Sequence, residues 1–198
     1  MNLPSVLSPF SINLNPGAFM FLLNLERVIS RYSILLGKLS ALLFILLLMN
    51  VFYDVLMRYV FNDVSIGMQE LEWHLYAAIF LLGIPYGLAT GGHVRVDLFY
   101  ERLSLKGKAW IDLFGCLLLL IPFATLVAYY GIGFASEAFK LGETSGDPGG
   151  LPYRWIIKAV IPFAFFSIAI SGLGMLLRCI NAIRGLSTKG FDHDPIQH

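Results

Sequence analysis

Charge is scarce in this sequence. Of its 198 residues only 14% are charged and 57% are hydrophobic, whereas about a quarter of the residues in a soluble domain are charged. This deficit excludes an ordinary soluble domain and predicts an integral membrane protein. The net charge of +1 comes with no basic stripe outside the apolar segments, so nucleic acid is not an expected partner.

Cysteine is scarce as well. The chain contains two, Cys116 and Cys179, and no CxxC motif. Both lie near the ends of apolar runs that are assigned below to the cytoplasmic side, where the compartment is reducing. We therefore expect neither a disulfide nor a metal site at these residues.

The first 17 residues contain three prolines but no lysine or arginine. A secretory signal peptide starts with positive charge, so this segment does not resemble one. We expect a loose tail at 1–17, and Met20 competes with Met1 as the first translated residue. Residues 18–30 mix apolar and charged side chains, which suits either a short helix lying in the membrane interface or the first turns of the next helix.

Apolar runs dominate the rest of the chain, and four of them are long enough to cross a hydrocarbon layer about 30 Å thick. The expected fold is all-α and membrane-integral, with four transmembrane helices and a short N-terminal interfacial helix in a domain at 18–180, and a mobile tail at 181–198. Pro85, Pro122 and Pro162 place one proline in each of the last three spans, which predicts three kinks and a straight first span. The spans run from about 32 to 53, 68 to 90, 109 to 133 and 155 to 178.

Basic residues are distributed unequally between the two membrane faces that these spans define. With both termini on one face, that face holds ten lysines and arginines and the other holds four. Because basic residues favour the cytoplasm, both termini and the second loop are expected inside, and the loop after Lys140 outside. The inner group comprises Arg27, Arg31, Lys38, Arg95, Arg102, Lys106, Lys108, Arg178, Arg184 and Lys189, and the outer group comprises Arg58, Lys140, Arg154 and Lys158.

Charged residues gather where the first two spans meet. Asp54 and Arg58 are four apart with the acid first, which favours a helical ion pair, although both equally mark the water boundary. Glu70 and Glu72 are expected in the first turn of the second span, where the helix dipole favours negative charge. Glu70 also shares a helix face with His74, and Arg58 approaches the same level. These residues form either a small polar cluster or a set of separately solvated charges.

Glycine recurs every four residues at Gly83, Gly87 and Gly91. This spacing draws a smooth ridge down one side of a helix, which lets another helix approach closely. The alternative is that glycine is simply frequent in membrane helices. We favour the packing ridge, and we expect a bulky side chain at Gly87 to weaken assembly or internal packing.

The sequence lacks the groups that catalysis or a cofactor would need. His74 and His93 are the histidines near the spans, and about 28 Å of helix separates them, so they cannot share one haem iron. No HExxH or GxSxG motif occurs, and the middle of each span carries no charge that would hold a charged substrate. We expect no catalytic residue, no cofactor and no metal site.

Several segments, taken in their order, resemble the small permease subunit of tripartite ATP-independent periplasmic (TRAP) transporters, the DctQ-like family. The resemblance covers roughly residues 25–180. The segments are RYVFN at 58–62, QELEWHLYAAIFLLG at 69–83, GGHVRVD at 91–97 and GETSGDPGGLPYRWIIKAVIP at 142–162.

The resemblance implies a non-catalytic scaffold with four helices and cytoplasmic termini in the bacterial inner membrane. Its partner would be a large permease subunit that carries the substrate and sodium sites, while a periplasmic receptor delivers an organic acid. The alternative is a cofactor-carrying membrane anchor subunit of a respiratory enzyme. Six residues fall on the family motifs, and the resemblance assigns them to helix ends and to the contact with the large subunit. They are Arg58, Glu70, Glu72, Trp73, His93 and Asp97.

The spacing of His93 and Asp97 would let them pair across one helical turn. The loop 143–153 is expected to be an ordered cap, because it is rich in glycine and proline. Its outward position also motivates the hypothesis that it touches the periplasmic receptor.

Overall fold

The computed structural model describes residues 16–91 and 103–184. Within these ranges the chain is helical apart from its connections, and it contains no strand. His93, Asp97 and most of the two predicted tails lie outside the described residues. The expected pairing of His93 with Asp97 therefore stays a prediction.

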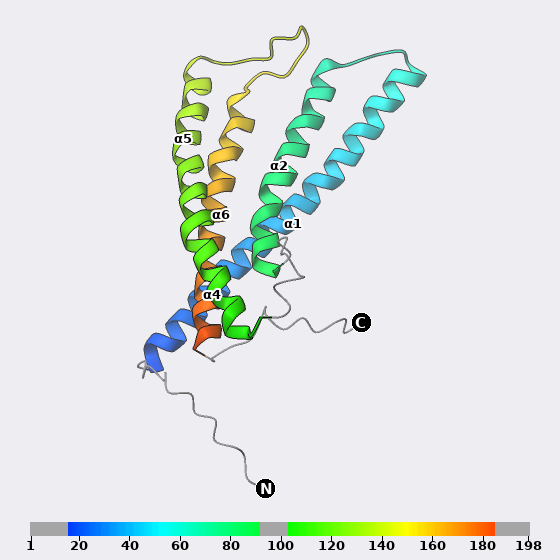
Figure 1. The fold of residues 1–198 in the computed structure, drawn as a ribbon. Coiled ribbons are helices and arrows are strands. Elements are labelled where there is room, and N and C mark those ends of the chain that lie inside the picture. Colours follow the sequence, from blue (N-terminus) through cyan, green and yellow to red (C-terminus); the bar gives the residue numbers. More distant parts are fainter. Residues whose placement is uncertain (1–15, 92–102, 185–198) are drawn as a thin grey trace, which may run out of the picture.

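The helices form four long rods, each apolar and long enough to cross a membrane. Their ends gather at two levels, with the connections after α1 and α5 at one level and the ends of α2 and α6 at the other (Figure 1). Each predicted span lies inside one rod. The rods are α1 (Pro16–Val60), α2 (Ile66–Thr90), a composite of α4 (Leu105–Gly115), the π-helical η1 (Cys116–Leu120) and α5 (Ile121–Lys140), and α6 (Trp155–Ile183).

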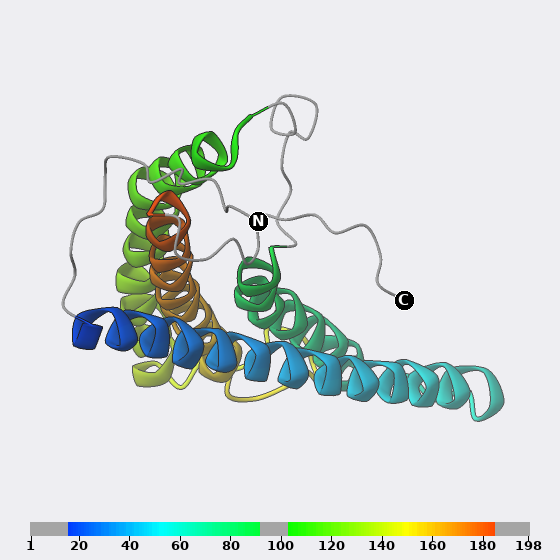
Figure 2. The same ribbon diagram turned by 90° about the horizontal axis from the view of Figure 1, so that it is seen from below.

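Residues 18–30 are the first turns of α1, so the separate interfacial helix expected at the N-terminus is wrong and the other interpretation holds. No proline or glycine interrupts the chain between residues 18 and 36, so nothing breaks the helix there. With 45 residues, α1 is about 67 Å long, roughly twice the hydrocarbon thickness. It is accordingly inclined to the other rods and extends past them at both ends (Figures 1 and 2).

The start of α2 corrects one expectation from the sequence. The helix begins at Ile66, and the side chain of Ser65 caps it by accepting a hydrogen bond from the Met68 amide. Glu70 and Glu72 therefore lie beyond the first turn, which contains no acidic residue. Since the dipole acts mainly within the first turn, it does not explain these carboxylates.

The third rod is irregular where proline was expected to disturb it. Pro122 occupies the first turn of α5, directly after the five-residue π-helical segment η1. π-Helix is rare and occurs mostly as single turns within α-helices, as it does here. Pro85 and Pro162 lie inside α2 and α6, and the bends expected there stay predictions.

Three small clusters of buried side chains join the rods, and α6 contributes to every cluster. Its spanning segment is 44% buried against the rest of the chain, compared with 17% for α1. The helix also extends beyond the predicted start of the C-terminal tail, because Asn181 is a buried residue of α6. The clusters are Leu36, Leu82 and Ala164; Leu88, Ala124 and Ile168; and Ala109, Cys179 and Ala182.

Candidate functional site

Glu70 joins α2 to the connection between α5 and α6. Its Oε1 accepts a hydrogen bond from Ser145 Oγ at 2.5 Å, and its Oε2 accepts one from the Leu151 amide at 2.7 Å. The Arg154 guanidinium lies 3.8 Å from Oε1. Glu70 thus bonds to a loop more than seventy residues away, rather than to the neighbouring groups that the sequence suggested.

The rest of this connection is also ordered by polar contacts. Lys158 forms an ion pair with Glu143 and lies over the Phe134 ring, 4.1 Å from its centroid. The Arg154 amide donates to the Glu143 carbonyl at 3.0 Å. A Cβ atom at Gly150 would meet the Ser145 side chain and Glu70, so the turn requires glycine there. These contacts agree with the expected ordered cap.

Arg58 pairs with Asp54, the partner that their spacing suggested. Its Nη2 lies 2.6 Å from Asp54 Oδ2, and the side chain of Asp54 is only 4% exposed. Asp54 Oδ1 and Arg58 Nε are buried and have no hydrogen-bond partner among the described residues. No hydrogen bond or ion pair links Arg58 to Glu70 in the described part of the chain, and a cluster that contains both stays a prediction.

Trp73 is exposed, and Glu72 and His74 beside it are half-buried. Within residues 16–91 and 103–184, Glu72 forms neither a hydrogen bond nor an ion pair, and Trp73 is 73% exposed. His74 shares the helix face of Glu70 but hydrogen-bonds to no residue that the structure describes. The exposed Trp73 is therefore available to lipid or to another chain.

The predicted glycine ridge does not pack against a helix of this chain along its length. A Cβ at Gly83 would lie 3.5 Å from Ser40 Oγ, an ordinary contact, and one at Gly87 would meet nothing within 4 Å. Gly91 instead ends α2 with a φ of 75°, a left-handed conformation that favours glycine. The prediction of internal packing at Gly87 is wrong, and packing against a partner chain stays a prediction.

Other glycines permit the close helix contacts. A Cβ at Gly37 of α1 would lie 2.6 Å from the Tyr86 ring, and one at Gly174 of α6 would lie 2.7 Å from Ile29 Cγ2. Each meets a different neighbouring helix, so no regular spacing marked them in the sequence.

Hydroxyl groups connect α1 and α6 in the middle of the bundle. Tyr32 bonds to Ser167 and Ser33 bonds to Ser171, each with 2.7 Å between the oxygens. Ser167 and Ser171 also donate to the carbonyls four residues before them, as expected for serine in a membrane helix. The contacts across helices were not evident from the sequence, because they join residues more than 130 positions apart.

A second polar junction joins three helices at the opposite end from Glu70. Arg178 Nη2 of α6 donates to the Ala89 carbonyl of α2 at 2.8 Å, and its Nε lies 3.6 Å from Glu26 Oε1 of α1. Asn181 donates to the other oxygen of Glu26 at 3.1 Å. The sequence held a signal for this junction, since Glu26 is the only carboxylate among the first 53 residues. A lone carboxylate in an apolar segment needs a cation.

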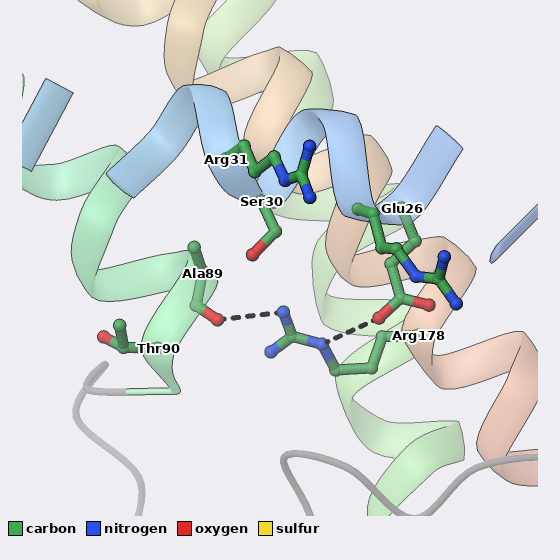
Figure 3. A pocket seen from close by; sticks show the side chains of 7 residues that line it. Glu26, Ser30, Arg31, Ala89, Thr90 and Arg178 are labelled. Carbon is green, nitrogen blue, oxygen red and sulfur yellow. Dashed lines mark hydrogen bonds and ion pairs between the residues drawn. The ribbon is translucent and has the colours of Figure 1, made fainter. Parts of the chain in front are cut away.

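This junction forms one wall of an open pocket of about 490 Å³ (Figure 3). No group of three or more His, Cys, Asp or Glu side chains in the described ranges could hold a metal ion. Cys116 and Cys179 are not joined by a disulfide, and the Cys116 thiol donates to the Gly172 carbonyl at 3.2 Å. The pocket is lined by Glu26, Arg27, Ser30, Arg31, Ala89, Thr90 and Arg178.

Comparison with known proteins identifies the family. The sequence model of the DctQ component of tripartite ATP-independent periplasmic transporters matches residues 47–182, more than half of the chain. A curated relative, the C4-dicarboxylate TRAP transporter small permease protein DctQ of Pseudomonas aeruginosa, is 27% identical over 119 residues, which are 57% of this chain and 56% of that protein. The chain thus spans about half the length of that relative. No solved structure matches it.

The matched residues include the last part of α1 (47–60), all of α2, α4, η1 and α5, and most of α6. Four spanning helices and this match describe a multi-pass protein of the bacterial inner membrane that is not an enzyme. The chain therefore belongs to the DctQ family, the small permease components of tripartite ATP-independent periplasmic transporters.

Proposed function

We propose that this chain braces the large permease subunit of a TRAP transporter during sodium-coupled, receptor-dependent uptake of an organic acid. The family match over residues 47–182 carries the proposal. The relative from Pseudomonas aeruginosa is named for C4-dicarboxylates, which are organic acids. In this proposal both termini face the cytoplasm, as the distribution of basic residues favours.

A scaffold role suits the polar groups of the bundle. A solute site at mid-depth needs donors or acceptors that the protein leaves available. The hydroxyls of Tyr32, Ser33, Ser167 and Ser171 instead bond to one another across α1 and α6. The buried side-chain atoms without a partner among the described residues belong to the Asp54–Arg58 pair near the outer end of α1.

The outer part of α1 is the surface that we propose for the large subunit. Phe52 and Tyr59 of α1 and Phe61 directly after the helix are exposed, and along the chain they lie on either side of the Asp54–Arg58 pair. Aromatic and arginine side chains contribute most of the binding energy at many interfaces. Lipid would cover the remaining apolar surface.

The subunit carries no cofactor and no metal in this proposal. The family match does not favour the alternative of a respiratory membrane anchor. Purification separates the two ideas, since a scaffold gives a colourless complex and an anchor gives a protein with bound haem or metal that absorbs visible light.

The test is coexpression of this chain with the large permease subunit of the same transporter. A tag on this chain should retain the large subunit, and proteoliposomes with both subunits, receptor and a sodium gradient should accumulate the organic acid. Uptake should be lost when this chain is omitted. Full uptake by the large subunit alone would refute the bracing role.

The periplasmic receptor is proposed to contact the cap formed by the connection between α5 and α6. Asp147 and Tyr153 are exposed on that cap. Substituting both by serine should reduce receptor-stimulated uptake while the two membrane subunits still copurify. Unchanged stimulation by the receptor would count against this contact.

A further inference from the structure

We propose that the pocket between α1, α2 and α6 binds the phosphate headgroup of an anionic phospholipid. The pocket lies where α2 ends at Thr90 and where Arg178 connects α6 to α2 (Figure 3). Headgroups lie at the ends of spanning helices. The proposal does not depend on the bracing role, because it concerns side chains within this chain alone.

The pocket carries a surplus of positive charge. Three arginines and one glutamate line it, a net charge of +2. Glu26 is engaged by Arg178 and Asn181, and Arg178 is engaged by Glu26 and the Ala89 carbonyl. Those two charges neutralise each other, so the surplus comes from Arg27 and Arg31.

Arg27 and Arg31 have little else to bind. Both are exposed, and the contact of Arg27 among the described residues is a long hydrogen bond of 3.4 Å to the neutral Asn24. Arg31 forms no hydrogen bond or ion pair with a residue that the structure describes. A guanidinium group often binds phosphate through two parallel N–H···O hydrogen bonds, and it is only weakly hydrated. Two such groups beside a pocket therefore suit a phosphate ligand.

The pocket also supplies neutral polar groups. The Ser30 hydroxyl points into the space between Ala89 and Arg178 (Figure 3). A hydroxyl donates readily to a phosphate oxygen. The ammonium group of phosphatidylethanolamine would face the surplus positive charge, which favours an anionic lipid such as phosphatidylglycerol over a zwitterionic one.

The helix face above the two arginines suits an acyl chain. Ile34, Leu35 and Leu42 are exposed on α1, and the first two lie one turn beyond Arg31 toward the middle of the membrane. Residues three and four apart share a helix face. A soluble anion would leave this apolar surface unused, whereas a phospholipid would cover it.

The test measures lipid binding to the full-length chain in detergent by native mass spectrometry. The probes are phosphatidylglycerol and phosphatidylethanolamine with identical acyl chains. Phosphatidylglycerol should bind more tightly, and each of Arg27→Gln and Arg31→Gln should weaken it about fivefold, the effect expected of one basic side chain at an anionic surface. The double variant Lys106→Gln/Lys140→Gln is the matched control, since both lysines are exposed and lie outside the pocket lining.

The expected result is that Arg27→Gln/Arg31→Gln loses phosphatidylglycerol while the control double variant retains it. Circular dichroism should show equal helix content in all variants, because the substituted side chains are exposed. Equal losses in the two double variants, equal affinity for the two lipids, or displacement of phosphatidylglycerol by inorganic phosphate would each overturn the proposal. The last result would assign the pocket to a soluble anion.

Discussion

Glu70 shows how one side chain can determine the conformation of a distant loop. Its two oxygens accept hydrogen bonds from Ser145 and from the Leu151 amide, and Arg154 lies beside it. Removing the Glu70 carboxylate would leave the groups that donate to it without an acceptor, and an unsatisfied, partly buried polar group destabilises the fold. Removing a carboxylate that accepts no hydrogen bond has no such cost.

We therefore expect Glu70→Ala to lower the melting temperature of the purified chain and to expose the cap to protease. Glu72→Ala is the matched control, because Glu72 is on the same helix and binds no described residue. It should leave both measurements unchanged. Equal effects of the two substitutions would show that Glu70 does not order the loop.

Two glycines provide a second prediction at this scale. A Cβ at Gly174 would lie 2.7 Å from Ile29 Cγ2, whereas one at Gly87 would meet nothing within 4 Å. Gly174→Ala should reduce the free energy of unfolding by about 1–3 kcal/mol through overpacking. Gly87→Ala should be neutral or should stabilise the chain by up to about 1 kcal/mol, because alanine favours helix. Detergent unfolding titrations measure both, and a greater loss for Gly87→Ala would contradict the packing described here.

Gly87→Leu tests whether the glycine face of α2 contacts the large permease subunit. Because Gly87 is open within this chain, a loss of copurifying large subunit in that variant would place the glycine face at the subunit interface. Normal assembly and uptake would assign the same face to lipid.

The helices are joined most firmly where a polar side chain contacts two of its neighbours. Arg178 of α6 binds both the Ala89 carbonyl of α2 and the Glu26 carboxylate of α1. Its side chain is 16% exposed and that of Glu26 is 20% exposed. Removing one partner of such a pair leaves the other charge partly buried without compensation.

Arg178→Ala should therefore reduce the free energy of unfolding by about 2 kcal/mol, less than for a fully buried pair because water still screens the site. The control is Arg27→Ala in the same pocket, where the side chain is exposed and the change should stay within about 0.5 kcal/mol. Unfolding in detergent gives both values. Similar values for the two variants would mean that Arg178 does not hold the three helices together.

At the scale of the whole molecule, the division of the basic residues along the sequence predicts the orientation in the membrane. The sequence assigns ten basic residues to the cytoplasmic side and four to the other. The four, Arg58, Lys140, Arg154 and Lys158, lie near the end of α1, the end of α5 and the start of α6, and the connections after α1 and α5 lie at one level (Figure 1). Lys38, one of the ten, lies in the middle of α1. Gly146→Cys should react with a membrane-impermeant maleimide added to intact cells, whereas Lys106→Cys should react only after lysis. The natural cysteines are buried and give little background. The reverse pattern of labelling would show that the connection between α5 and α6 faces the cytoplasm and would contradict the predicted orientation.

Much of the architecture was predictable because the responsible signals are local. A run of about 20 apolar residues is sufficient to identify a spanning helix, and each of the four runs lies inside one observed rod. The i, i+4 spacing of Asp54 and Arg58 likewise indicated their ion pair. The order of the motifs that resemble the DctQ-like family can also be read directly from the sequence, and the family match confirms that resemblance.

Contacts between helices were not predictable in the same way. Lipid is as apolar as a protein core, so hydrophobicity does not mark which face of a membrane helix is buried. The glycine spacing indicated Gly87, which is open, and missed Gly37 and Gly174, which are enclosed. Whether residues 18–30 continue the first span was also undecided until α1 proved to be a single helix.

The number of spanning helices, the distribution of basic residues between their ends and the family pattern all follow from the order of residues alone, because each depends on residues that are near one another in the chain. Only the tertiary structure decided that Glu70 holds a loop 75 residues away and that Glu26 meets Asn181 across 155 residues. Such partners come together only after the helices have packed. Packing depends on the shapes of the side chains, which cannot be deduced from the periodicity of the sequence.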